Sequence, residues 1–169
     1  MTTVCRLAAL AGLMLALVAG ALAQDQDKAS VKTAAASTFG SLPGLPSCVT
    51  LSVQRGDPTK GAAVILAKMT SGCDIPWYWH SAAEQVMIVR GKARIAMKDA
   101  TTTAVSAGDY IYLPSKHHYH VTCTAATTFF AVTDGAFDIH YVDKDGKEIP
   151  PDQALKPAAK PAAKSGGKK

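Results

Sequence analysis

The twenty residues from Gly72 to Gly91 place the tightest constraint on how this chain of 169 residues folds. An apolar run broken by a proline leads to His80, a turn of small residues follows, and a second apolar run begins at Glu84. This order predicts a strand, a turn and a second strand. Side chains alternate between the two faces of a strand, so Tyr78 and His80 share a face on which Glu84 can join them.

Both ends of the chain differ in composition from the middle. Arg6 precedes an uncharged apolar stretch, and the small residues before Gln24 suit signal peptidase, so residues 1–23 are predicted to be a secretory signal. The apolar stretch is shorter than the ~20 residues that span a bilayer, so no membrane span is expected. Residues 24–44 are predicted to be a linker or N-terminal arm, and residues 148–169 a disordered tail rich in Lys, Pro and Ala.

The predicted tail also accounts for the basic charge of the protein. The formal net charge is +5, and five lysines lie between Lys156 and Lys169, so the rest of the chain is close to neutral. Without a basic stripe on a predicted element, no nucleic-acid partner is expected. The tail could touch an anionic surface such as a membrane or cell wall. Together with the signal, these features predict a secreted or periplasmic protein.

From residue 45 to residue 147, short segments rich in Val, Ile, Thr and Tyr are separated by turn residues. Turn signals about every 8–12 residues are typical of an all-β sandwich or barrel, and no stretch has a sustained helical period. This length suits one hydrophobic core. The expected strands are Cys48–Gln54, Ala62–Met69, Ile75–His80, Glu84–Arg90, Lys92–Met97, Thr103–Ser106, Tyr110–Leu113, His118–Cys123, Thr127–Thr133 and Phe137–Val142.

The stretch from Gly72 to Gly91 resembles the first motif of the cupins, small β-barrels of the double-stranded β-helix or jelly-roll type. That motif is a glycine, five residues, His-x-His, three or four residues, Glu, six residues and a glycine. Every spacing matches, but Tyr78 stands in place of the first histidine. The resemblance covers the segment from about residue 45 to residue 143 and implies an all-β, cupin-type jelly-roll barrel.

The second cupin motif is a glycine, five residues, Pro-x-Gly, two residues and a histidine. Gly108 and Pro114 match its first half, but strict counting ends on Tyr119, between His118 and His120. Strict spacing turns Tyr119 inward, whereas a one-residue bulge would turn the two histidines inward, and bulges occur beside active sites. We expect His118 or His120 to contribute to the site, with Tyr119 as the alternative.

In cupins these positions surround a metal, so the resemblance implies a mononuclear Fe, Mn, Ni or Cu site held by imidazole and carboxylate donors. His80 and Glu84 are the expected ligands, joined by a side chain of the second motif. Tyr78 can bind Fe(III) or Cu(II) as a phenolate; alternatively it orients the substrate, or fills the barrel with its hydroxyl hydrogen-bonded. Tyr78 and Glu84 are the predicted catalytic residues.

Three functions are compatible with these residues. The first is an exported, metal-dependent oxidoreductase, dioxygenase-like, that acts on a small organic molecule. The second is a non-catalytic cupin that binds a small ligand or carbohydrate, because Tyr78 and Tyr119 suit stacking and hydrogen bonding to neutral ligands. The third is a metal-free isomerase of the sugar-epimerase type, which needs a cationic pocket, and few internal arginines are present beyond Arg90 and Arg94.

Three cysteines remain after removal of the predicted signal, at Cys48, Cys73 and Cys123. An oxidising compartment predicts one disulfide and one thiol among them. In cupins the strand of the first motif lies beside the strand that ends the second motif. The resemblance therefore implies a disulfide between Cys73 and Cys123.

The remaining aromatic and histidine residues are assigned structural roles. Trp77 and Trp79 lie on the face opposite Tyr78 and are expected to belong to the barrel core or to a dimer contact. The resemblance also implies a homodimer. His140 lies in an apolar strand and is expected to be a hydrogen-bonded structural residue.

Overall fold

The computed structural model describes residues 29–156. The predicted signal peptide and the predicted tail beyond residue 156 lie outside these residues. The chain divides into two units, residues 1–31 and residues 32–169. Of the first, residues 29–31 are described, and they are exposed and without regular secondary structure. The fold below is that of the second unit.

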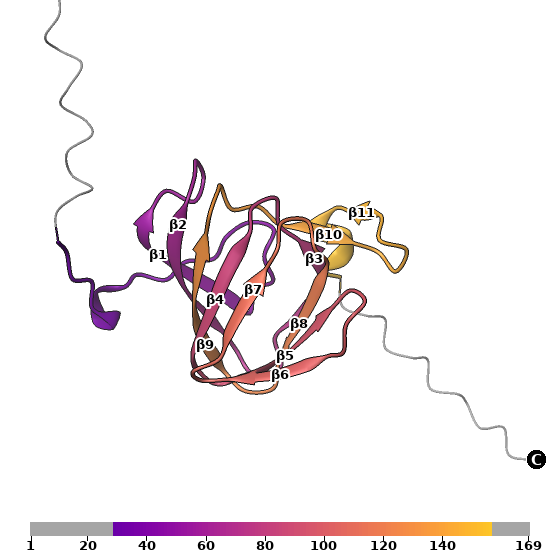
Figure 1. The fold of residues 1–169 in the computed structure, drawn as a ribbon. Helices are drawn as coiled ribbons and strands as arrows, with labels where there is room; N and C mark the ends of the chain where they lie inside the picture. Colours follow the sequence, from indigo (N-terminus) through magenta and orange to yellow (C-terminus); the bar gives the residue numbers. More distant parts are fainter. Residues whose placement is uncertain (1–28, 157–169) are drawn as a thin grey trace, which may run out of the picture. The chain divides into compact units, whose positions relative to one another are not determined.

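The described residues form two antiparallel sheets (Figure 1), with strand orders β1-β2-β9-β4-β7 and β11-β10-β3-β8-β5-β6. The ten predicted strands are confirmed, with ends that differ by at most three residues. The elements are η1 (Ala34–Ala36), β1 (Val49–Gly56), β2 (Ala63–Met69), β3 (Asp74–Trp79), β4 (Glu84–Arg90), β5 (Lys92–Met97), β6 (Thr103–Ser106), β7 (Tyr110–Leu113), β8 (Tyr119–Cys123), β9 (Thr127–Thr133), β10 (His140–Val142), β11 (Glu148–Ile149) and α1 (Pro151–Ala154).

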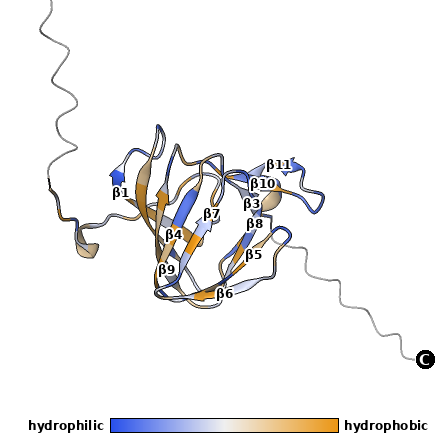
Figure 2. Ribbon diagram, in the orientation of Figure 1, coloured by the Kyte–Doolittle hydropathy of each residue, from blue (hydrophilic) through white to orange (hydrophobic). Residues whose placement is uncertain are grey.

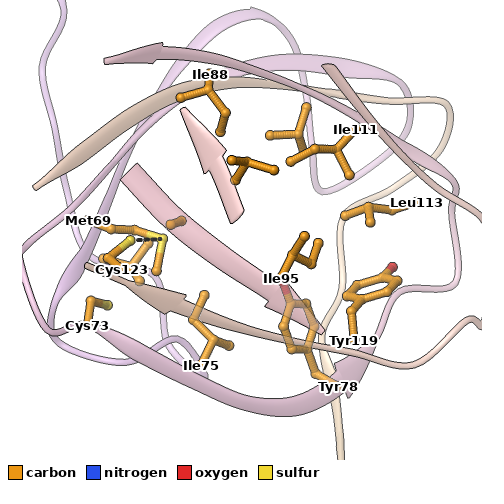
Figure 3. Packing of buried hydrophobic residues seen from close by; sticks show 14 of the residues in the cluster. Met69, Cys73, Ile75, Tyr78, Ile88, Ile95, Ile111, Leu113, Tyr119 and Cys123 are labelled. Carbon is orange, nitrogen blue, oxygen red and sulfur yellow. Dashed lines mark hydrogen bonds between the residues drawn. The ribbon is translucent and has the colours of Figure 1, made fainter. Parts of the chain in front are cut away.

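The hydrophobic core lies between the two sheets, because alternate side chains of each strand point inward. On β4, Val86 and Ile88 are buried in the core. Gln85, which precedes Val86, and Val89, which follows Ile88, are exposed. Each strand therefore carries residues of mixed hydropathy (Figure 2), and the inward side chains pack together in the interior (Figure 3). The prediction of an all-β jelly-roll fold is confirmed.

A bulge interrupts the pairing of β3 with β8 and sets which side chains face inward. Ile75 pairs with Val121 and Tyr78 pairs with Tyr119, so two residues of β3 lie opposite one residue of β8. Pro76 is one of these two, and a proline, which cannot donate to the ladder, is tolerated at a bulge. The bulge lets Ile75 and Tyr78 both face the core although three positions separate them.

Both ends of the predicted domain extend further than expected. Ile149, Ala154 and Leu155 pack against the core, so the predicted start of a disordered tail at residue 148 is too early. Their apolar side chains supply the packing that the lysines and prolines of the tail cannot. In the predicted arm, Gly40 forms a β-bridge with Leu51 of β1. No helix in the described part of the chain is long and apolar enough to cross a membrane.

The disulfide joins Cys48 to Cys73, so the predicted pairing of Cys73 with Cys123 is wrong. The expected adjacency of the strands of the two motifs, β3 and β8, does exist, because Cys123 N–H donates to the carbonyl of Cys73 at 2.8 Å. The turn after β2 also returns to Cys48, whose carbonyl accepts a hydrogen bond from Thr70 N–H at 3.1 Å. Cys123 is the free cysteine among the described residues, and its buried thiol lies 3.7 Å from the sulfur of Met69 (Figure 3).

Replacing Cys48 by Ser is expected to lower the free energy of unfolding by about 3 kcal/mol, because the bond closes a loop between residues 25 positions apart. Urea unfolding of wild type and variant measures the loss. A reductant should bring the wild type down to the stability of the variant and leave the variant unchanged. Equal stability without reductant would contradict the prediction.

The two glycines that bound the first motif differ in their surroundings. Both have positive φ, 74° at Gly72 and 95° at Gly91. A Cβ at Gly72 would meet nothing within 4 Å, whereas at Gly91 it would lie 2.2 Å from the carbonyl oxygen of Ala126 and 2.6 Å from Cα of Thr127. The second glycine is therefore required by a close backbone approach as well as by its conformation.

Gly91→Ala is accordingly expected to destabilise the protein more than Gly72→Ala. The left-handed conformation costs the alanine at either position about 1–2 kcal/mol, and the overlap with backbone atoms at Gly91 adds about 2–3 kcal/mol or more. Chemical denaturation of the two variants compares them directly. Equal losses of stability in the two variants would show that the backbone near Ala126 can move aside without a cost in free energy.

Candidate functional site

His80 follows β3 and is held by hydrogen bonds at its ring and its backbone. The ring atom Nδ1 faces the backbone carbonyl oxygen of Asp138 at hydrogen-bonding distance. A carbonyl oxygen only accepts, so Nδ1 carries the proton and, in the neutral ring, Nε2 carries the lone pair. His80 is buried and lines the interior cavity, so this lone pair belongs to a side chain inside the barrel.

The loop of the second motif closes over this histidine. The N–H of Lys116 donates to the carbonyl of His80 at 2.8 Å, and Ser115 Oγ donates to the carbonyl of Ser81 at 2.6 Å. Lys116 has φ 59°, the left-handed conformation that a glycine adopts without strain. The loop therefore keeps the backbone expected of the motif although a lysine occupies the position of its glycine.

Glu84 begins β4 and lies beside the histidine. Its Oε2 is 3.6 Å from Nε2 of His80, and the two side chains are only 8% and 6% exposed. Burial raises the pKa of Glu84 above its ordinary value, and the neighbouring His80 acts in the opposite direction. One carboxyl and one imidazole thus share an enclosed site, with Oε2 and Nε2 directed toward each other closely enough for one cation to contact both.

Tyr78 and Tyr119 meet edge to face next to this pair (Figure 3). Their ring centroids are 4.9 Å apart and perpendicular, and the Tyr78 ring lies 5.2 Å from that of His80. Burial, followed by the charge of Glu84, raises the pKa of both phenols well above the ordinary value, so they are neutral. The Tyr119 hydroxyl lies near the backbone of His80 but makes no hydrogen bond of ordinary geometry with any described residue.

An apolar cavity of about 80 Å³ adjoins these groups. This volume is several times the ~10–15 Å³ that one water needs. The cavity is lined by apolar side chains of both sheets, and its polar lining consists of Tyr78, His80, Glu84, Cys123 and Thr127. Neither lysine nor arginine lines it within the part of the chain that the structure describes. The cavity suits a small molecule that is mostly apolar and carries a polar group.

The expectation that His118 or His120 faces the barrel is wrong, and strict spacing holds. Tyr119 is fully buried in the core, whereas Nε2 of His120 lies 2.7 Å from the exposed carboxylate of Asp74. The bulge considered for β8 lies instead on β3, opposite His120, so β8 alternates without interruption. His118 is only partly buried and is not among the residues that line the cavity.

Comparison with known proteins supports the fold. Residues 65–133 match the family profile described as "Cupin domain". These residues form a cupin domain. This cupin resembles an RmlC-like cupin of Ralstonia eutropha JMP134 at 16% identity, over 76% of this chain and 85% of that one, with a TM-score of 0.59. An RmlC-like cupin of Shewanella frigidimarina NCIMB 400 is 12% identical over 66% and 95% of the two chains, with a TM-score of 0.54.

A third similar structure belongs to an enzyme. The DMSP lyase DddQ of Ruegeria pomeroyi DSS-3 is 18% identical over 67% of this cupin and 64% of its own chain, with a TM-score of 0.54. Functionally curated proteins give no match. At these identities the structural similarities establish the fold of this cupin.

Two donor atoms of this cupin lie close enough together to contact one metal ion. Within residues 29–156, no group of three His, Cys, Asp or Glu side chains comes together as a metal site. Two ligand bonds of about 2.0–2.2 Å can join donors up to about 4 Å apart, so one ion can contact His80 Nε2 and Glu84 Oε2 together. Further donors would be the phenols of Tyr78 and Tyr119, of which the second has a buried hydroxyl without a partner.

Two residues that adjoin the site of this cupin were not predicted from the sequence. Phe137 lines the cavity, and its ring lies 4.9 Å from the ring of His80. Asp138 accepts the His80 hydrogen bond through its backbone carbonyl. Every residue has such a carbonyl, so no residue type could have indicated this contact. The hydrogen-bonded role predicted for His140 is confirmed by its contact with Glu148 at 2.7 Å.

Proposed function

We propose that this cupin binds a transition metal ion through His80 and Glu84 and acts with it on a small organic molecule. The proposal is carried by the buried pair of His80 Nε2 and Glu84 Oε2, which lie 3.6 Å apart and belong to residues that line an apolar cavity. Burial of two ionisable groups costs free energy unless the groups are paired with each other or with a metal ion. Such buried pairs cluster at functional sites. The His80 lone pair is also already directed by the carbonyl of Asp138.

Tyr78 belongs to the polar lining of the cavity, and Tyr119 packs edge to face against it. Both are neutral phenols in the metal-free protein, and Fe(III) or Cu(II) would shift the proton equilibrium of Tyr78 far enough for it to bind as a phenolate. A bound metal would supply Lewis acidity and open coordination positions for substrate or oxygen. Glu84 and Tyr78 are the groups placed to hold or transfer a proton next to that substrate.

The lining of the cavity supports one class of substrate. Its apolar lining and its lack of lysine and arginine, within the described residues, favour a mostly apolar molecule with one polar group that reaches His80 and Glu84. We propose an oxygen-dependent oxidoreductase, and the similarity to a DMSP lyase makes a lyase assay the natural companion to an oxygen-uptake assay. The disulfide suits an oxidising compartment. Export and homodimer formation remain predictions.

Metal analysis of protein isolated from its native compartment tests the proposal. We expect close to one equivalent of a first-row transition metal and, with Fe(III) or Cu(II), a visible charge-transfer band that Tyr78→Phe removes. A content below about one tenth of an equivalent after purification without chelators would contradict the proposal, since structural and catalytic metal sites remain loaded under such conditions.

A second candidate is a cupin that binds a small ligand without metal. The observation that favours it is that no set of three His, Cys, Asp or Glu donors converges among residues 29–156. In that case a small neutral ligand should raise the melting temperature equally with and without a chelator, and His80→Ala should leave the rise intact. Loss of the rise on chelation would favour the metal-dependent function.

A further inference from the structure

The hairpin of β10 and β11 carries a chain of hydrogen-bonded side chains that ends at His80. Glu148 Oε1 lies 2.7 Å from His140 Nδ1, and His140 Nε2 lies 3.2 Å from Asp138 Oδ2. The other carboxylate oxygen of Asp138 accepts a hydrogen bond from Ser81 N–H at 2.8 Å. The backbone carbonyl of Asp138 accepts from His80 Nδ1. Asp138 therefore holds both His80 and the residue that follows it.

The same hairpin holds the strand that precedes His80. His140 pairs with Trp79 in the β ladder, and the two rings stack with centroids 3.9 Å apart and planes 6° from parallel. Tyr141 pairs with Tyr78 in the same ladder. Each residue from 78 to 81 therefore has a partner among residues 138–141, and this contact surface includes the hydrogen bond that orients the His80 ring.

The chain of contacts leads from solvent to the buried site. The side chain of Glu148 is 58% exposed, that of Asp138 37% and that of His140 27%, whereas that of His80 is 6% exposed. The outer members can therefore be replaced without opening the cavity, since none of these three residues lines it. Because these residues lie away from the cavity, their effect on His80 can be measured without changing the residues that would contact a substrate.

We propose that Asp138, anchored by His140 and Glu148, is a positioning residue that fixes the tautomer of His80 and the direction of its Nε2. A neutral imidazole carries one ring proton, and the acceptor opposite Nδ1 keeps that proton on Nδ1. This acceptor is the backbone carbonyl, which any residue at position 138 retains, but the side-chain contacts of Asp138 with Ser81 and His140 hold it in place. Without these contacts the carbonyl could move away from Nδ1 and allow the proton onto Nε2, which then could neither bind a metal nor accept a proton from a substrate. The tautomer itself does not depend on the proposed function; only the effect on metal affinity rests on it.

Nitrogen-15 chemical shifts of the His80 ring in metal-free protein report the tautomer directly. We expect the Nδ1–H form in wild type and a mixture of both forms in Asp138→Ala. Asp138→Asn retains an oxygen that accepts from Ser81 N–H and should restore the Nδ1–H form. Asp134→Asn, an exposed acid in the same segment, is the matched control and should behave as wild type.

Titration with Co²⁺ gives the second readout. Loss of a residue that orients a metal-binding histidine weakens affinity by about 10–100-fold, and we expect this loss in Asp138→Ala, with Asp138→Asn and Asp134→Asn close to wild type. If wild type binds no Co²⁺ but the tautomer shifts as expected, the positioning role stands and the proposed metal-dependent function fails.

His140→Phe keeps the experiment decisive if Asp138→Ala does not fold. Phenylalanine retains a ring to stack on Trp79 but removes the hydrogen bonds to Asp138 and Glu148. We expect a partial shift of the His80 tautomer and a few-fold loss of Co²⁺ affinity. The proposal would be overturned if folded Asp138→Ala kept a pure Nδ1–H form of His80 and wild-type affinity for Co²⁺. If Asp138→Ala does not fold, the same result in His140→Phe would overturn it.

Discussion

Replacing His80 by Ala should weaken the metal binding proposed for this protein by at least ~100-fold. His80 supplies the imidazole donor of the buried site, and its Nε2 lies 3.6 Å from Glu84 Oε2. Removal leaves one carboxylate and two neutral phenols, which are weak ligands for first-row transition ions compared with a set that includes imidazole. Isothermal titration with Cu²⁺ or Co²⁺ should show at least a ~100-fold loss of affinity.

His120→Ala is the matched control for this substitution. His120 lies on the neighbouring strand, but its ring faces the outside and contacts the carboxylate of Asp74 and the ring of Trp77. Affinity in this variant should stay within about 3-fold of wild type, as for a surface histidine away from the site. A loss that is equal in the two variants, or confined to His120→Ala, would mean that the metal binds outside the barrel.

The fold could be predicted from the sequence because its determinants are local. Strand ends coincide with glycine, proline and aspartate turns, and the segments between these turns are short and rich in Val, Ile, Thr and Tyr. The inward position of Tyr119 also followed from strict spacing. The prediction that preferred His118 or His120 failed because the bulge lies at Pro76 of β3. A proline within a predicted strand was the available signal for it.

The site could be predicted only in part, because several of its contacts depend on tertiary proximity. The disulfide is decided by the return of the chain after β2 to Cys48, which strand patterns do not encode. The C-terminal segment was misjudged from its composition, although Ile149 and Leu155 pack on the core. The orientation of His80 depends on a backbone carbonyl supplied 58 residues later. Motif spacing therefore identified His80 and Glu84, but not what holds them.

Replacing Tyr119 by Phe should stabilise the metal-free protein and weaken its site. The Tyr119 hydroxyl is buried and has no hydrogen-bond partner within residues 29–156. An unsatisfied buried polar group costs about 1–3 kcal/mol, so its removal with retention of the ring should raise the free energy of unfolding by that amount. Proteins retain destabilising groups of this kind at functional sites. The Tyr119→Phe variant should therefore bind metal or ligand less tightly than wild type.

Tyr141→Phe separates this effect from a general tolerance of phenylalanine in the core. Tyr141 is as deeply buried as Tyr119, at 1% and 0% exposure, but its hydroxyl donates to the carbonyl of Gly44 at 2.8 Å. Loss of that hydrogen bond should lower the free energy of unfolding by about 1 kcal/mol. Thermal unfolding in the presence of a chelator should therefore move the two variants in opposite directions, by roughly 2–8 °C for each kcal/mol. A lower melting temperature for Tyr119→Phe would show that its hydroxyl is satisfied in solution and would remove it from the candidate ligands.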